Sequence, residues 1–104
     1  MGKLKVAILG SGNIGTDLLI KILRSDLLEC FLFVGRSLSS AGMQKASSLG
    51  VKISDKSIDA IIESKDEIDL VFDATSAASH KKHALVFKEL KIKCIDMTPS
   101  QVGD

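Results

Sequence analysis

Short apolar runs alternate along the chain with longer segments in which apolar residues recur every three or four positions. The short runs are rich in aliphatic and β-branched residues, as is typical of strands, and they occupy residues 4–9, 28–34, 51–53, 70–73 and 93–97. The longer segments can each place their apolar residues on one side of a helix, and they lie near residues 14–23, 43–49, 58–62 and 84–90. The pattern therefore predicts strands that alternate with helices, the last helix beginning near Ser79.

This alternation determines the expected fold class. Strands that alternate with helices form right-handed βαβ crossovers, which place helices on both faces of a mostly parallel sheet. A chain of 104 residues buries only about two-thirds of its unfolded surface, which is enough for one core. We therefore predict a single α/β domain over residues 1–104, with a doubly wound parallel sheet of about five strands in the order 3-2-1-4-5.

The first predicted strand is followed directly by a GSGNIG sequence at residues 10–15, which has the GxGxxG spacing of dinucleotide-binding loops. Gly10 permits the tight turn, Gly12 leaves space for the pyrophosphate, and Gly15 allows close packing of helix and strand. The free N–H groups of the following helix would bind the anion. Because strand, loop, helix and second strand fit one βαβ unit of roughly 30 residues, we interpret the loop as a Rossmann-type cofactor site rather than a turn without a ligand.

The end of the second predicted strand leaves the choice of cofactor open. An acidic residue about 20 positions after the glycine loop binds the adenosine ribose in NAD enzymes, but this chain has Gly35, Arg36 and Ser37 there. Arg36 and Ser37 could receive the 2′-phosphate of NADP, or Arg36 could be a solvated residue stacked on adenine. The residues themselves do not decide between NAD and NADP.

Composition excludes several other classes of function. The 14 basic and 13 acidic residues give a net charge of +1, which favours neither nucleic acid nor an anionic membrane. The first residues lack a signal-peptide core, and no apolar stretch approaches the ~20 residues that span a bilayer, so we expect a soluble, cytoplasmic protein. Cys30 and Cys94 lie in separate apolar runs and are predicted to be buried thiols. His80 and His83 lie three residues apart at the start of a predicted helix and are expected to have no Cys or carboxylate cluster nearby, so no metal site is expected.

Three separated blocks resemble one known family. They are KVAILGSGNIGTDLLIK at residues 5–21, DLVFDATSA at residues 69–77 with His80 after it, and IDMTP at residues 95–99. In this order they resemble the amino-terminal, NAD-binding part of acylating, CoA-dependent acetaldehyde dehydrogenases, and the similarity covers the whole chain. Three blocks are more specific than the glycine motif, which many unrelated families share.

The resemblance implies an enzyme that converts acetaldehyde, coenzyme A and NAD to acetyl-CoA and NADH. The family forms an acyl-thioester on a cysteine and usually works with a 4-hydroxy-2-oxovalerate aldolase, in the catabolism of aromatic hydrocarbons. That cysteine and a second domain follow the Thr-Pro block and are expected beyond Asp104. This chain is therefore expected to be the cofactor-binding fragment of a longer enzyme, inactive alone and without a catalytic residue of its own. Arg36 departs from the Asp that members often carry at its position, which puts the preference for NAD in doubt.

Two alternatives to this function remain open: a stand-alone module that senses NAD(H) or another adenine nucleotide, and the cofactor domain of another oxidoreductase, such as a semialdehyde or sugar dehydrogenase. The resemblance places nucleotide contacts on residues 11–14 and a cofactor-facing loop at the end of the fourth strand. Together with the motif, it predicts that the dinucleotide-binding residues are Gly10, Ser11, Gly12, Asn13, Ile14, Gly15, Arg36, Ser37, Thr75 and Ser76.

Overall fold

The predicted strands form one parallel sheet in the order β3-β2-β1-β4-β5, as expected. A computed structural model describes residues 2–98. The strands are β1 (Leu4–Leu9), β2 (Leu28–Val34), β3 (Ile53–Ser54), β4 (Leu70–Asp73) and β5 (Cys94–Asp96), and the helices are α1 (Asn13–Leu23), α2 (Ala41–Ser48), α3 (Ile58–Glu63) and α4 (Ala77–Glu89).

Two predictions fall on residues outside the described range. Pro99, which ends the third family block, lies outside it, and so does Asp104, the residue beyond which the family cysteine is expected. The domain bounds of 1–104 and the position of that cysteine therefore stay predictions, whereas the part of the chain that the structure describes forms one sheet with its helices.

The two outer strands and one helix differ from the sequence prediction. Val51 lies outside β3 because its N–H group donates to the carbonyl of Ala46 at the end of α2, rather than to a neighbouring strand. β5 is confined to Cys94–Asp96. Helix α4 begins at Ala77 instead of near Ser79, because the Ser76 hydroxyl accepts a hydrogen bond from the Ser79 N–H and caps the helix.

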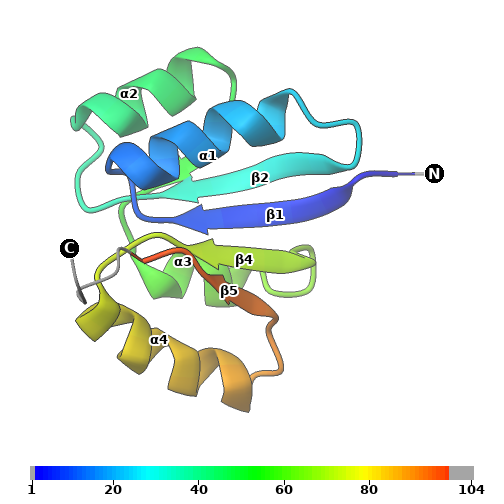
Figure 1. Ribbon diagram of the computed structural model, residues 1–104, viewed down its shortest axis with the longest axis vertical. Coiled ribbons are helices and arrows are strands. Elements are labelled where there is room, and N and C mark those ends of the chain that lie inside the picture. The colour runs from blue at the N-terminus through cyan, green and yellow to red at the C-terminus, as the bar shows by residue number, and fades with distance from the viewer. Residues whose placement is uncertain (1, 99–104) are drawn as a thin grey trace, which may run out of the picture.

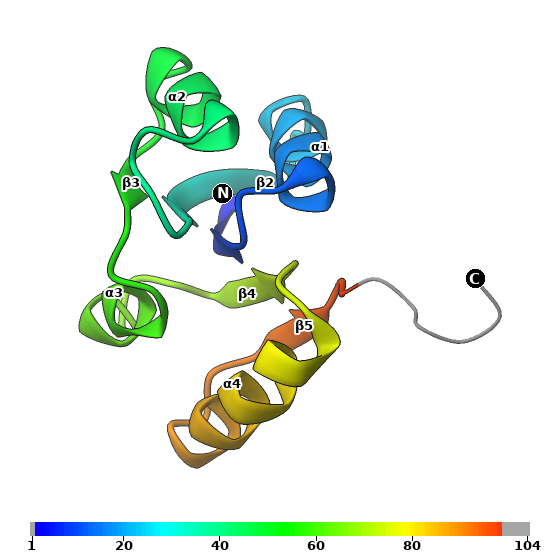
Figure 2. The ribbon, with the colours of Figure 1, turned by 90° about the vertical axis from the view of Figure 1, so that its left-hand side faces the viewer.

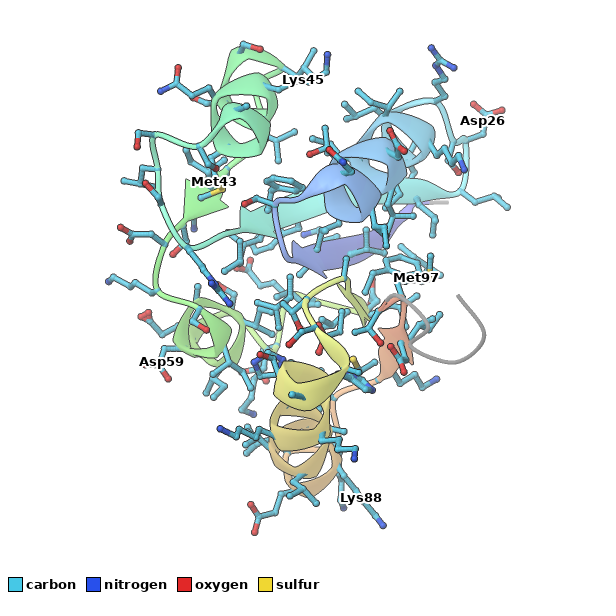
Figure 3. All side chains as sticks on the ribbon, turned by 60° about the vertical axis from the view of Figure 1, so that its left-hand side comes forward. Asp26, Met43, Lys45, Asp59, Lys88 and Met97 are labelled. Carbon is cyan, nitrogen blue, oxygen red and sulfur yellow. The ribbon has the colours of Figure 1, made fainter. Side chains whose placement is uncertain are left out.

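Helices cover both faces of the sheet (Figures 1 and 2): α1 and α2 lie on one face, and α3 and α4 lie on the other. Alternate residues of β1 enter the two resulting cores, since Val6 and Ile8 pack on the first face and Ala7 and Leu9 on the second. Figure 3 shows the same segregation on α2, where Met43 points toward the sheet and Lys45 points away. The largest fully buried apolar side chains are Phe33, Phe87, Ile8, Leu19, Leu32, Met43 and Ile61.

The change of face after β3 creates the feature that matters for function. Because α1 and α2 lie on one face and α3 and α4 on the other, the loops that leave β1 and β4 diverge at the carboxyl edge of the sheet. Ligands of open α/β sheets bind at this point of reversal. Within residues 2–98, none of the helices has both the length and the apolar character needed to cross a bilayer.

Candidate dinucleotide site

A cleft of about 680 Å³ lies at the carboxyl edge of the sheet, where the strand order reverses between β1 and β4. This volume is within the usual range for small-molecule sites. The loops after β1, β2, β3 and β4 and the first turns of α4 form its walls. The predicted binding residues that line it are Gly10, Ser11, Gly12, Arg36, Ser37, Thr75 and Ser76.

The other three predicted residues lie beside the cleft. Asn13 lines a neighbouring hollow between the amino ends of α1 and α2. Ile14 is an exposed residue of α1, and Gly15 is buried behind the loop. Which of the ten residues contact a dinucleotide stays a prediction, but the structure gives Gly15 a packing role instead of a place on the cleft surface.

Close packing determines the shape of the glycine loop. Gly10 has a φ of +116°, and a Cβ atom there would lie 2.7 Å from the carbonyl oxygen of Ala74 in the loop after β4. A Cβ atom at Gly15 would overlap the carbonyl oxygen of Gly10. The Gly10 N–H also donates to the Val34 carbonyl at 2.7 Å, and the Ala74 N–H donates to the Leu9 carbonyl at 2.7 Å. The loops after β1 and β4 are therefore fixed to each other and to the end of β2.

Gly12 has a different surrounding, which suits an anion. No atom lies within 4 Å of a Cβ atom built at Gly12, so the space beside this backbone is open. Gly12 is also the N-cap of α1 and has no side chain that could accept from the first N–H groups of the helix. These donors and the positive end of the helix dipole are thus available to a pyrophosphate in the cleft.

Two further glycines support the loop and were not identified from the sequence. Cβ atoms at Gly35 and Gly42 would overlap atoms of Ser11, the side-chain hydroxyl in the first case and the carbonyl oxygen in the second. Gly42 is the second residue of α2, and glycine is unfavourable inside a helix. A glycine within a predicted helix is therefore the sequence feature that could have indicated this close contact. Both glycines let the end of β2 and the start of α2 approach the phosphate loop.

Arg36 lines the cleft together with Ser37 and Ser40. It is exposed and forms no ion pair with another residue in the range 2–98. Ser40 caps α2, since its hydroxyl accepts from the Met43 N–H at 3.4 Å. Asp55, after β3, also lines the cleft and was not predicted to do so. A guanidinium, hydroxyls and one carboxylate therefore line the part of the cleft that follows β2 and β3.

A buried carboxylate stands behind the cleft at the end of β4. The side chain of Asp73 is fully buried, and its Oδ1 accepts hydrogen bonds from the N–H (3.0 Å) and hydroxyl (2.5 Å) of Thr75. Its Oδ2 lies 2.8 Å from Nδ1 of His80 and 2.8 Å from Nδ1 of His83. Burial raises the pKa of Asp73, but the hydrogen bonds from Thr75, His80 and His83 outweigh it, so the pKa lies below its ordinary value. An ionised Asp73 only accepts hydrogen bonds, so both Nδ1 atoms carry protons.

The sequence prediction was wrong about the surroundings of the two histidines. Asp73 lies beside both, and Asp73, His80 and Cys94 have ligand-type atoms within 4.8 Å of one another. These residues come from the end of β4, from α4 and from β5, so only the tertiary fold brings them together. Four donors, from Thr75, His80 and His83, already bind the two oxygens of Asp73. The absence of a metal stays a prediction. His83 also lines the cleft.

The two cysteines are less buried than predicted, because each is only partly covered. Burial nevertheless raises the pKa of the Cys30 thiol to about 11. Burial, together with the negative charges of Asp73 and Asp96, raises the pKa of Cys94 to about 12. A thiol with such a pKa is almost entirely protonated at neutral pH, and the protonated form is a poor nucleophile.

Another hollow lies at the opposite edge of the sheet and is lined by Leu4, Ile68, Ile92 and several charged residues. It adjoins the carboxyl ends of α3 and α4, and its lining combines three lysines with two aspartates but includes neither the glycine loop nor the start of a helix. The cleft at the glycine loop is therefore the candidate site, and its geometry defines a dinucleotide-binding α/β domain.

Comparison with known proteins agrees with this class. Residues 5–101 match the family described as semialdehyde dehydrogenase, NAD binding domain. The chain belongs to this family.

Curated relatives confirm the predicted resemblance to acetaldehyde dehydrogenases. The chain is 61% identical over 100 residues to the acetaldehyde dehydrogenase of Spirochaeta aurantia and covers 34% of it, with 96% of the chain aligned. It is 54% identical over 101 residues to that of Pectobacterium atrosepticum and again covers 34%, with 97% of the chain aligned. The chain thus spans about a third of the length of the curated relatives it matches.

Solved structures confirm the fold. GenD2 from gentamicin A biosynthesis, solved in complex with NAD, matches with a TM-score of 0.80 at 21% identity, over 92% of this chain and 27% of that one. Biliverdin reductase from Synechocystis, solved with biliverdin and NADP⁺, matches with a TM-score of 0.75 at 26% identity, over 89% of this chain and 28% of that one.

Proposed function

We propose that this domain binds NAD in the cleft between β1 and β4 and forms the cofactor part of an acylating aldehyde dehydrogenase. The observation that carries the proposal is the open backbone at Gly12, which lines a cleft at the point of strand reversal and begins α1 without a side-chain cap. In this proposal the loop at Gly10–Gly12 and the start of α1 bind the pyrophosphate, with Gly15 packed behind them. The residues after β2 receive the adenosine ribose, and Thr75 and Ser76 face the cofactor. The family relationship supports the choice of NAD.

The resemblance supports the finer points of the reaction. Acetaldehyde is the substrate, coenzyme A is the acyl acceptor, and a 4-hydroxy-2-oxovalerate aldolase supplies the aldehyde. Bound NAD would accept a hydride from the substrate, and this domain's own residues would bind and orient the dinucleotide. In this proposal the thiol that carries the acyl group lies beyond the position of Asp104, in the part of the relatives that the chain does not cover.

Calorimetric titration of the 104-residue chain with NAD tests the binding function directly. We expect saturable binding at one site, competed by ADP-ribose, which carries the pyrophosphate and adenosine without the nicotinamide. No binding of either compound at millimolar concentration would contradict the proposal.

Arg36→Asp should weaken the binding of NADP more than that of NAD. The guanidinium can form charge-assisted hydrogen bonds to a 2′-phosphate, and losing them costs about 1–3 kcal/mol. The carboxylate introduced by the substitution would in addition repel the phosphate and accept from the ribose hydroxyls of NAD. The measurement is the ratio of the two Kd values for each protein, with Ser37→Ala as a milder change at the same end of the cleft. An unchanged ratio would assign Arg36 to adenine stacking or to solvent.

Neither cysteine should supply acyl-transfer activity. With pKa values of about 11 for Cys30 and about 12 for Cys94, alkylation by iodoacetamide at pH 8 should be slow compared with that of the unfolded chain. Cys30→Ser and Cys94→Ser should lower the free energy of unfolding and leave nucleotide affinity unchanged. Acetyl-CoA formation by the 104-residue chain, abolished in either variant, would contradict this assignment.

A further inference from the structure

The carboxyl ends of β4 and β5 have the same local construction, an Asp-X-Thr turn. Asp96 Oδ1 accepts from the N–H (2.8 Å) and hydroxyl (2.6 Å) of Thr98, just as Asp73 Oδ1 accepts from Thr75. The two aspartates are directly paired in the register of the parallel strands. Each turn therefore commits one carboxylate oxygen and leaves Oδ2 for another partner.

His80 lies between these two remaining oxygens. Its Nδ1 is 2.8 Å from Asp73 Oδ2 and donates a hydrogen bond to it. Its Nε2 is 3.8 Å from Asp96 Oδ2, which is too long for a hydrogen bond but allows an ion pair when the imidazole is protonated. His83 makes the same contact with Asp73 through its own Nδ1, but its Nε2 has no carboxylate within 4 Å among the described residues. A protonated His80 thus pairs with the carboxylates of both strand ends, whereas His83 pairs with Asp73 alone and is the matched control.

Thr75 connects the Asp73 carboxylate with the cleft. Both donors of Thr75 are bound to Asp73, so the position of Thr75 at the cleft follows the orientation of that carboxylate. His80 fixes this orientation from the other side of the carboxylate and relates it to β5. The Met97 N–H, which donates to the Asp73 carbonyl at 2.8 Å, links the same two strand ends through the backbone.

We propose that His80 is a positioning residue for the dinucleotide cleft: in its protonated form it pairs with the aspartates of the Asp-X-Thr turns of β4 and β5 and thereby holds Thr75 in its place against the cofactor. The role in binding rests on the proposed function, whereas the bridge itself does not require a ligand. His80 acts on the cofactor only through Asp73 and Thr75.

The bridge is tested on the ligand-free chain by NMR. Hydrogen bonds to carboxylates move amide protons downfield, so the Thr75 and Thr98 amides report on the two turns. We expect His80→Ala to move both signals upfield. His80→Asn, whose side-chain NH₂ group can replace the Nδ1 donor, should restore Thr75 and leave Thr98 shifted. His83→Ala should leave the Thr98 signal in place. An unchanged Thr98 signal in His80→Ala, or an equal change in His83→Ala, would overturn the bridge.

The positioning role is tested by NAD affinity, measured well below the unfolding temperature of each variant. We expect His80→Ala to raise the Kd about fivefold, the effect of about one net hydrogen bond, and His80→Asn to return it to within about twofold of the wild type. Equal affinity of the wild type and His80→Ala would overturn the positioning role. If the wild type itself binds no dinucleotide, the proposed function fails, and the amide signals still decide whether the bridge exists.

Discussion

Gly12→Val should abolish measurable binding of NAD, with an increase of at least about 100-fold in Kd, or roughly 3 kcal/mol. A branched side chain at this position fills the space in which the pyrophosphate meets the N–H groups of α1. The fold should tolerate the change, because no atom lies within 4 Å of the new Cβ and the backbone of Gly12 is already extended, with φ −78° and ψ −162°. Titration calorimetry and chemical unfolding of the same samples would separate binding from stability.

Gly2→Val is the matched control for this experiment, since Gly2 also has open space around it and lies on the amino-terminal side of β1. It should bind NAD like the wild type. Gly12→Ala should give an intermediate affinity, because one methyl group occupies less of the space. Equal affinities of Gly12→Val and the wild type would refute the assignment of the cleft.

Asp73→Ala should lower the free energy of unfolding by about 2–4 kcal/mol, because a buried carboxylate that accepts four hydrogen bonds is removed. The substitution leaves the donors of Thr75 and of both imidazole rings without their partner. The rings are only 18% and 14% exposed, so water replaces that partner poorly. Urea unfolding at pH 7 measures the difference.

Asp73→Asn is the control that retains the shape of the side chain. Its amide oxygen can still accept from Thr75, and its NH₂ group can donate to both imidazoles if they exchange tautomers, so a loss of about 1 kcal/mol is expected.

The folded-state pKa of Asp73 lies below its value of 3.8 in the unfolded chain. The stability supplied by the ionised carboxylate is therefore complete above that value and is lost as the pH falls through the lower, folded-state pKa. The gap between wild type and Asp73→Asn should close below about pH 4. A gap that is constant down to pH 2 would exclude the ionised network.

The bounds of a strand could be predicted from the sequence where the strand is buried on both faces of the sheet. Strands β1, β2 and β4 have the predicted bounds because their apolar runs are buried between helices on both faces. The edge strands were less predictable. Residues near β3 have only β2 as a partner, and Val51 bonds to the end of α2 instead.

The cofactor loop could be predicted, but its supports could not. Residues 10–15 form a local motif, whereas Gly42 contacts Ser11 only after α2 packs beside the loop. Asp73 was passed over because it ends an apolar run and its partners are brought to it by the tertiary fold. His80 and His83 reach it from successive turns of α4, and Asp96 comes from the next strand. No spacing rule joins these residues in the sequence.

The packing of Gly15 against Gly10 has a consequence for the energetics of binding. A loop that is held by backbone contacts from α1, β2 and the end of β4 has few alternative conformations in the free protein. Little conformational entropy then remains to be lost when a ligand arrives, and more of the interaction free energy is expressed as affinity. The anion-binding surface is in this sense preorganised, and free and bound domains should have the same backbone in residues 10–15.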